Sequence, residues 1–400
     1  MTNVSDQEGI KTLSVLCLTT SFPKSPDDPA GFFVYQLTEA LVKKDVRIAV
    51  LSPEGNQAAE EWQLPYKVYR FHYAPRRWQV LAQRPGGVPV ALKLSWKNYL
   101  LVPPFLISFL WNILRLARES DLILANWAFC GVLARFSSPL HHKPIVTVLR
   151  GSDVKIGGGD WRSSLFLNTA LKGSKLVVCV GKELETWLRK TADYPEKIYH
   201  IPNGIYERFF SIDFPKISPT INILFIGSLI PRKGVDILLK AIKNIAHLRL
   251  HLFIVGQGPL EQELKELASE LKIAHLVTFQ GKISPGRPMA EMMARAHFLV
   301  LPSHHEGRPN VILEAMAAGR PVIGSDIDGV RELVQHSKTG YLFADGDIKA
   351  LSQVIEKLVK NPDKFSEMGR AARKWLSGQG LSWENTAKEY VNILKRYKVS

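Results

Sequence analysis

Residues 222–241 read NILFIGSLIPRKGVDILLKA, and this stretch predicts the architecture of the chain. The apolar run at 222–227 is typical of a buried β-strand, and a loop with glycines and two cations follows it. The segment after that loop has the apolar spacing of an amphipathic helix. Strands that are apolar on both faces belong to parallel sheets covered by helices, so this unit predicts an α/β fold.

The same strand–loop–helix unit recurs on both sides of this stretch. Segment 211–220, SIDFPKISPT, has two prolines and no periodicity and is the best linker candidate. Four hundred residues also exceed one ordinary core. We therefore predict two Rossmann-like domains facing a cleft, 1–210 and 221–381, and a final helix within 382–400 that packs back on the first domain. The predicted strands are 13–19, 46–52, 67–73, 121–126, 144–150, 175–181 and 197–204 in the first domain, and 222–227, 248–256, 276–281, 297–303, 320–325 and 339–343 in the second.

Composition indicates an ordinary globular protein, with 46% apolar and 22% charged residues. Each of the three cysteines, Cys17, Cys130 and Cys179, lies in an apolar run without metal-site spacing, which predicts buried thiols and a reducing compartment. The first 14 residues, MTNVSDQEGIKTLS, lack the apolar core of a secretory signal. We expect a cytoplasmic protein.

The net charge of +15 is unevenly distributed along the chain. No Asp or Glu occurs from Trp62 to Arg118, a stretch that also holds the apolar run NYLLVPPFLISFLWNIL. Pro103 and Pro104 interrupt that run, so we do not predict a membrane span. We expect peripheral contact with an anionic membrane; the alternative is a core helix with a solvated basic end. No nucleic-acid motif accompanies the charge, so no nucleic-acid partner is expected. The cations of this stretch are Lys67, Arg70, Arg76, Arg77, Arg84, Lys93, Lys97, Arg115 and Arg118.

The strongest constellation for chemistry is Glu306-Gly-Arg-Pro-Asn-Val-Ile-Leu-Glu314, which follows a predicted strand and crosses a helix start. Free backbone N–H groups at a helix N-terminus can hold phosphate or sugar oxygens. Glu306 can accept hydrogen bonds from sugar hydroxyls, and Glu314 from a ribose diol. The alternative is one glutamate favoured by the helix dipole and one exposed glutamate.

Two further strand-end loops carry glycines. In the first, Gly227–Gly234, the glycines allow close backbone approach and Arg232 and Lys233 could neutralise a diphosphate. The alternative is two solvated cations in a turn. The second, Val255-Gly-Gln-Gly-Pro259, is a tight turn between strand and helix and is a weak signal by itself.

Taken in order, these motifs resemble the C-terminal domain of family 4 retaining glycosyltransferases of the GT-B superfamily. The resemblance covers 222–343 and includes FIGSLIPRKGVDILLKA, VGQGPLEQEL, FQG, LPSHHEGRPNVILEAMAAGRPVIGS, DGVRELV and TGYLF. It implies that Lys233 contacts donor phosphate, Glu306 the transferred sugar and Glu314 the ribose, with the turn at 280–283 near the base. The first domain is similar at TTSFPKSPDDPAGFFVYQLTEAL and at IPNGI.

Three positions depart from the family pattern. Its Gly-Gly loop reads Ala30-Gly31, and the arginine often found after the glycine of the FIG strand is Ser228. A histidine common in the family is replaced by Arg150, whose cation can still face phosphate or sugar. Our candidate catalytic residues are Glu306, Lys233, Arg232 and Arg150, and the candidate donor-binding residues are Gly31, Gly227, Gly256, Gly258, Gly281, Gly307, Asn310, Val311 and Glu314.

The aspartates Asp326 and Asp328 imitate the metal-binding DxD motif of the other major glycosyltransferase fold. We interpret them as a turn and a helix start, roles that suit aspartate. Asp153 is expected to cap or pair locally. We expect no metal site and no cofactor, with a nucleoside-diphosphate sugar as co-substrate.

The functional hypothesis is hexose transfer with retention of configuration, an outcome that the resemblance implies. The acceptor would be lipid-linked or a polysaccharide, at the inner face of the plasma membrane. The alternatives are a GT-B sugar-nucleotide epimerase or phosphorylase, or a catalytically inactive scaffold.

Overall fold

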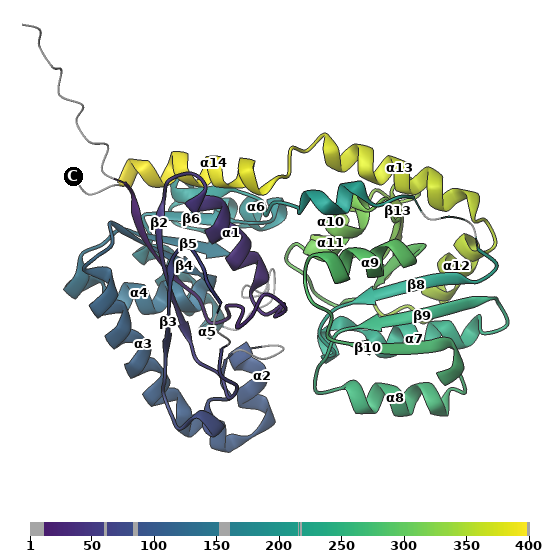
Figure 1. The fold of residues 1–400 in the computed structure, drawn as a ribbon, viewed down its shortest axis with the longest axis horizontal. Helices are drawn as coiled ribbons and strands as arrows, with labels where there is room; N and C mark the ends of the chain where they lie inside the picture. The colour runs from purple at the N-terminus through teal and green to yellow at the C-terminus, as the bar shows by residue number, and fades with distance from the viewer. Residues whose placement is uncertain are drawn as a thin grey trace, which may run out of the picture.

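The computed structural model describes residues 12–59, 62–82, 87–151, 161–214, 216 and 218–397. Two α/β domains lie side by side, each built on one sheet flanked by helices (Figure 1). All strand pairings in both sheets are parallel, which confirms the predicted fold class. Arg84 and Asp153 lie outside the described residues.

The first domain holds a seven-stranded sheet in the order β3-β2-β1-β4-β5-β6-β7. Strand β1 is buried along its whole length because alternate side chains enter different layers: Val15 and Cys17 join one core cluster, and Leu16 and Leu18 another. Two-sided burial explains why its sequence is uniformly apolar. The strands are β1 (Ser14–Leu18), β2 (Arg47–Pro53), β3 (Lys67–Phe71), β4 (Leu122–Asn126), β5 (Ile145–Leu149), β6 (Leu176–Cys179) and β7 (Ile198–His200); the helices are α1 (Phe32–Val42), α2 (Gly87–Leu94), α3 (Val102–Ala117), α4 (Trp127–His141), α5 (Trp161–Gly173) and α6 (Lys182–Thr191).

The second domain holds a six-stranded sheet in the order β10-β9-β8-β11-β12-β13 around one large apolar core. In both sheets the strand order reverses once, between β1 and β4 and between β8 and β11. Open α/β sheets bind ligands outside the strand ends at such switch points. The elements are β8 (Ile221–Ile226), β9 (Leu250–Val255), β10 (Val277–Gly281), β11 (Phe298–Leu301), β12 (Val322–Ser325), β13 (Gly340–Phe343), α7 (Val235–Asn244), α8 (Glu261–Glu270), α9 (Arg287–Arg295), α10 (Asn310–Ala317), α11 (Asp328–Arg331), α12 (Ile348–Val359) and α13 (Asp363–Ser377).

The last helix, α14 (Trp383–Leu394), returns to the first domain and lies along its upper edge in Figure 1. It packs against α1, and its Ala387, Tyr390 and Leu394 are buried in the same core cluster as Val15. Where the chain crosses back, Ile205 pairs with Ser382 in an isolated bridge. The two crossings of the chain between the domains therefore run side by side.

The proline-containing segment after the first crossing is fixed to the second domain. Arg320 donates to the carbonyl of Asp213, Arg373 to that of Ile212, and His297 to that of Lys216. The chain enters the second domain's core before this segment, because Phe209 is buried there. Segment 211–220 thus has linker composition, but its described residues Ile212, Asp213 and Lys216 are bound to the second domain.

Helix α3 continues a 3-10 turn, Trp96–Leu101, into one 22-residue helical stretch that ends at Ala117. By length and composition alone this stretch could cross a membrane, with a mean hydropathy of 1.7. One face nevertheless packs into the first domain through Phe105, Phe109 and Ile113, all buried. The helix therefore belongs to the domain and presents its other face to the surroundings. The three cysteines, Cys17, Cys130 and Cys179, are buried, as predicted.

Candidate active site between the domains

The switch point of the second sheet brings the two strongest motifs together. Lys233 lies in a 3-10 turn, Pro231–Lys233, between β8 and α7, and Glu306 lies between β11 and α10. Because β8 and β11 are neighbours, these loops touch: the His304 N–H donates to the Arg232 carbonyl at 2.9 Å. The Arg232 guanidinium donates to the His305 carbonyl at 3.3 Å.

Lys233 Nζ and Glu306 Oε1 form a tight ion pair, and the two side chains are 13% and 8% exposed. Burial opposes the charged form of Glu306, but the charges of Lys233 and Arg232 and the hydrogen bond from Lys233 more than offset it. The pKa of Glu306 is therefore below its ordinary value. The result is an ionised, oriented carboxylate beside two cations.

Four of the predicted donor-binding glycines lie on the ends of the neighbouring strands β8, β9 and β10. The Gly256 N–H donates to the Gly281 carbonyl at 2.8 Å. A Cβ on Gly256 would lie 1.9 Å from the Gly227 carbonyl oxygen, and one on Gly258 2.2 Å from that of Leu229. These glycines therefore let adjacent loops pack backbone to backbone, which builds the floor of the site.

Helix α10 begins at Asn310 and carries Val311 and Glu314. Its first N–H groups have no intrahelical acceptor, so the helix start is suited to binding anionic or sugar oxygens. Glu314 is partly buried, and burial raises its pKa to about 8. A protonated carboxyl at neutral pH can donate as well as accept a hydrogen bond, which suits a diol partner.

Arg150 follows β5 in the first domain, and its guanidinium is engaged by protein groups. It donates to Asn126 Oδ1 at 2.7 Å and to Asn203 Oδ1 at 3.2 Å. It also lies over the Phe33 ring, 4.2 Å from the centroid. Asn203 in turn donates to Asn310 at the start of α10 at 3.2 Å. Arg150 thus reaches the second domain through Asn203, and its contact with a donor stays a prediction.

Gly31 has a φ of 68° and precedes α1, where a Cβ would lie 2.1 Å from the Ser21 carbonyl oxygen. Asp28 shapes this loop by accepting from the N–H groups of Lys24 and Ala30, both at 3.1 Å. It also pairs with Lys282 of the second domain at 2.9 Å. The β1–α1 loop is therefore tied to the turn after β10.

Asp326 and Asp328 lie in a turn after β12 and at the start of α11, as predicted. Both carboxylates accept from Arg331, at 2.7 and 3.1 Å. In the part of the chain that the structure describes, no three His, Cys, Asp or Glu side chains gather in a way that could hold a metal ion.

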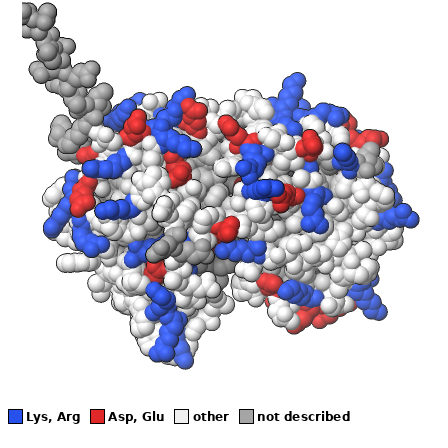
Figure 2. Space-filling model, in the orientation of Figure 1, with Lys and Arg blue, Asp and Glu red and all other residues white. Residues whose placement is uncertain are grey.

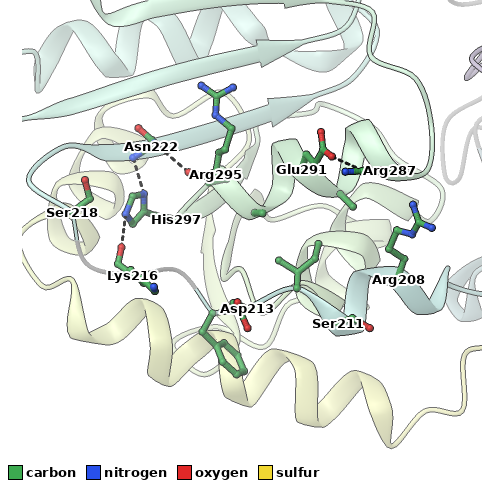
Figure 3. Close-up of a pocket in the computed structure, with 15 residues that line it drawn as sticks. Arg208, Ser211, Asp213, Lys216, Ser218, Asn222, Arg287, Glu291, Arg295 and His297 are labelled. Atoms are coloured by element: carbon green, nitrogen blue, oxygen red, sulfur yellow. Dashed lines mark hydrogen bonds and ion pairs between the residues drawn. The ribbon is translucent and has the colours of Figure 1, made fainter.

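A cavity of about 830 Å³ lies at the opposite edge of the second sheet, between α9 and residues 208–218 (Figure 3). His297 spans one end, since it accepts from the Asn222 N–H and lies 3.1 Å from the Lys216 carbonyl oxygen. Arg287 is paired with Glu291. None of the predicted site residues lines this cavity, which lies at the amino ends of the strands, whereas the candidate site lies at their carboxyl ends.

The structure therefore gathers Arg232, Lys233, Glu306 and the start of α10, while Arg150 approaches from the first domain. Sequence reasoning missed Asp28, Lys282 and Glu332, which join the domains around this site. Asp28 and Glu332 lie in runs that carry the family resemblance, but only the placement of the domains gives them partners.

Family profiles match most of the chain: "Glycosyltransferase Family 4" matches residues 30–208 and "Glycosyl transferases group 1" residues 210–375. N-acetyl-alpha-D-glucosaminyl L-malate synthase from Bacillus anthracis is 27% identical over 306 residues, 73% of this chain and 79% of that protein. A GDP-mannose-dependent alpha-(1-6)-phosphatidylinositol monomannoside mannosyltransferase from Mycobacterium tuberculosis is 32% identical over 183 residues, 43% of this chain and 47% of that protein.

Solved structures share the fold across nearly the whole chain. Sucrose-phosphate synthase from Thermosynechococcus elongatus superposes with a TM-score of 0.78 at 20% identity, covering 96% of this chain and 98% of that one. Anabaena HepE in complex with UDP and glucose gives 0.75 at 20% identity, covering 96% and 99%. The two profiles, the relatives and the two parallel-sheet domains agree, and the chain belongs to the family 4 type of glycosyltransferases with the GT-B fold.

Proposed function

We propose that this enzyme transfers a hexose from a nucleoside-diphosphate sugar with retention of anomeric configuration. The observation that carries the proposal is the buried Lys233–Glu306 pair at the switch point, beside Arg232 and the start of α10. Relatives support the donor class, since one is named as GDP-mannose-dependent and HepE has been solved with UDP-glucose.

Each group has a task that its surroundings favour. Arg232, Lys233 and the amides of α10 would stabilise the negative charge that develops on the departing diphosphate. Glu306, already ionised, would accept hydrogen bonds from sugar hydroxyls, and Glu314 would bind the ribose. With cations and helix amides carrying the leaving-group charge, the proposal requires no metal or organic cofactor.

The first domain would hold a lipid-linked or polysaccharide acceptor at the inner face of the plasma membrane. Among the described residues, every strongly exposed large apolar side chain except Tyr206 lies between Trp78 and Phe166. On α3, Ile107 and Trp111 are 68% and 69% exposed. Lys and Arg gather at the lower tip of this domain, near α2 and the start of α3 (Figure 2).

The proposed membrane surface spans three helices, because α4 packs between α3 and α5. Helix α4 exposes Phe136 and Leu140, and α5 exposes Leu165. No Asp or Glu occurs within α2, α3, α4 or α5. Apolar side chains among cations, without anions, fit the interface of an anionic bilayer. The protein would bind it peripherally, since α3 packs one face into the domain core.

Two other functions fit the fold less well. A sugar-nucleotide epimerase or a phosphorylase does not need a basic, apolar surface on the domain opposite the donor. An inactive scaffold does not need the Lys233–Glu306 pair, because taking two charges out of water carries a desolvation penalty that lowers stability.

A ligand screen followed by product analysis tests the proposal. Melting temperatures are measured with UDP, GDP, ADP and their common sugar conjugates, because a ligand of the native state raises the melting temperature. The effective donor is then offered with lipid-linked and polysaccharide acceptors, and proton NMR identifies the product anomer. Retention in the product is the expected result. An inverted anomer would refute the stereochemistry, and an absence of binding to any of these ligands would favour the scaffold.

A further inference from the structure

We infer that Glu332 is a positioning residue that fixes the Glu306–Asn310 loop of the second domain against α6 of the first domain. This inference rests on the proposed function for its catalytic consequence. Glu332 follows α11, and its Oε2 accepts from the backbone N–H groups of Lys182 at 2.9 Å and Glu183 at 3.4 Å. Its Oε1 accepts from Arg308 Nε at 3.2 Å.

Helix α6 lacks an N-terminal cap from its own domain. It begins at Lys182, and its N-cap residue is Gly181, which has no side chain. The first N–H groups of a helix need acceptors, and the positive end of the helix dipole favours a carboxylate there. Glu332 supplies that carboxylate from the other domain, so the cap forms only when the two domains lie together.

The other end of the contact leads directly into the active-site loop. Arg308 lies two residues after Glu306, and its side chain is only 5% exposed. By binding Arg308, Glu332 holds the loop that begins at Glu306 and ends at Asn310, the first residue of α10. A one-ångström displacement of such a loop can cost about 100-fold in rate.

We call the contact of the Glu306–Asn310 loop and Glu332 with residues 150–151 and 181–183 of the first domain the domain seam. Glycines at this seam bring the two backbones into direct contact. Gly151 of the first domain has a φ of 83°, and a Cβ on it would lie 2.3 Å from Gly307 Cα. A Cβ on Gly307 would lie 2.0 Å from the Arg150 carbonyl oxygen. The closest approach of the domains is therefore set by backbone atoms, and Glu332 holds the domains at that limit.

The seam and the donor pocket are separable by mutation. Lys233 and Glu314 lie in the second domain, whereas the hydrogen bonds of Glu332 among the described residues go to Lys182, Glu183 and Arg308, so we expect nucleotide binding to that domain not to need the cap. Loss of the cap instead lets the domains separate. The expected signature is a lower kcat with an unchanged nucleotide affinity.

The test compares Glu332→Ala with Glu332→Gln, which keeps an acceptor oxygen. A third variant, Gly151→Ala, places a methyl group of the first domain against Gly307 of the second. Glu356→Ala, which breaks an exposed ion pair with Lys360 on α12, is the matched control. The measurements are kcat, the Kd of whichever of UDP, GDP and ADP stabilises the wild type most, and the radius of gyration in solution.

For Glu332→Ala and Gly151→Ala we expect kcat to fall about 10- to 100-fold, the nucleotide Kd to stay within about twofold, and the radius of gyration to rise. Glu332→Gln should lie between them and the wild type, and the control should match the wild type. An unchanged kcat or an unchanged radius of gyration in both variants would overturn the inference, as would a nucleotide Kd that weakens in step with kcat. If the wild type transfers no sugar, the proposed function fails. The radius of gyration of the variants does not depend on transfer, so an unchanged radius rejects the positioning role of Glu332 separately.

Discussion

Lys282 Nζ lies 2.9 Å from Asp28 Oδ1, an ion pair that joins the turn after β10 to the β1–α1 loop of the other domain. The lysine side chain is 43% exposed, whereas Asp28 is 11% exposed and also accepts from two backbone N–H groups of its own loop. Asp28 is therefore both a domain contact and a loop organiser.

The two partners should differ in their effect on stability. Lys282→Ala should lower the free energy of unfolding by less than about 1 kcal/mol, because exposed ion pairs contribute little. Asp28→Ala should cost about 1–3 kcal/mol, because it leaves two loop N–H groups without acceptors. Urea unfolding of each variant measures the difference. Equal losses would show that the ion pair, rather than the loop, dominates.

The Lys233–Glu306 pair should be needed for turnover more than for folding. Lys233→Ala should lower kcat about 100- to 1,000-fold, as loss of a group that stabilises transition-state charge does. It should also lower the melting temperature, because Glu306 stays buried without its cation. Adding Glu306→Gln should restore the melting temperature but not turnover.

Lys240→Ala is the matched control, since Lys240 pairs with Asp236 at an exposed site on α7. Because the pKa of Glu306 is lowered, the stability it contributes is present above its ordinary pKa and is lost as the pH falls below that value. A double variant that regained turnover would refute the assigned roles of both residues.

The strands could be predicted from the sequence because two-sided burial leaves continuous apolar runs, as at Val15–Leu18. Most predicted runs extend one or more residues beyond their strands, whereas 46–52 and 222–227 equal β2 and β8 in length and differ from them by a shift of one residue. The meeting of Lys233 and Glu306 also follows from sequence, because strand ends at a switch point are neighbours.

Side-chain contacts between the domains could not be predicted. The cap that Glu332 provides depends on how the two sheets face each other, and no local pattern encodes that. Arg150 was expected to face the donor, but its amide partners Asn126 and Asn203 come from distant loops. A cation at a strand end does not reveal by itself whether a ligand or the protein binds it.

Glu314 should cost stability at neutral and alkaline pH. Its pKa is about 8 in the folded protein because of burial, against an ordinary value of 4.5. The unfolded chain therefore loses this proton first, and the folded state is progressively disfavoured from about pH 4.5 to about pH 8. Glu314→Gln should melt at the wild-type temperature at pH 4 and at a higher temperature at pH 8. Parallel melting curves across this range would contradict the shift.

Glu183 should make the seam sensitive to pH. Burial, and after it the nearby carboxylates of Asp328 and Glu332, raise its pKa to about 7, with Arg331 acting in the opposite direction. As the pH rises through 7, Glu183 ionises beside Glu332, and repulsion between the two carboxylates should weaken the contact between the domains. The radius of gyration of the wild type should increase between pH 6 and pH 8, whereas that of Glu183→Gln should not. The same increase in both proteins would assign the effect to other groups.

The surface formed by α3, α4 and α5 should bind anionic vesicles through charge and apolar contact together. Arg115→Glu with Arg118→Glu should weaken sedimentation with vesicles of equal parts phosphatidylglycerol and phosphatidylcholine, since each cation near such a surface contributes about 1 kcal/mol. Lys364→Glu with Lys374→Glu on α13 makes the same charge change on the other domain and should leave binding nearly unchanged. Wild-type binding should fall at high salt, which screens exposed charges. If both charge reversals weaken vesicle binding equally, the net charge of the protein rather than this surface attracts the membrane. If salt has no effect, insertion of Ile107 and Trp111 dominates binding. In that case Trp111→Asp should abolish it.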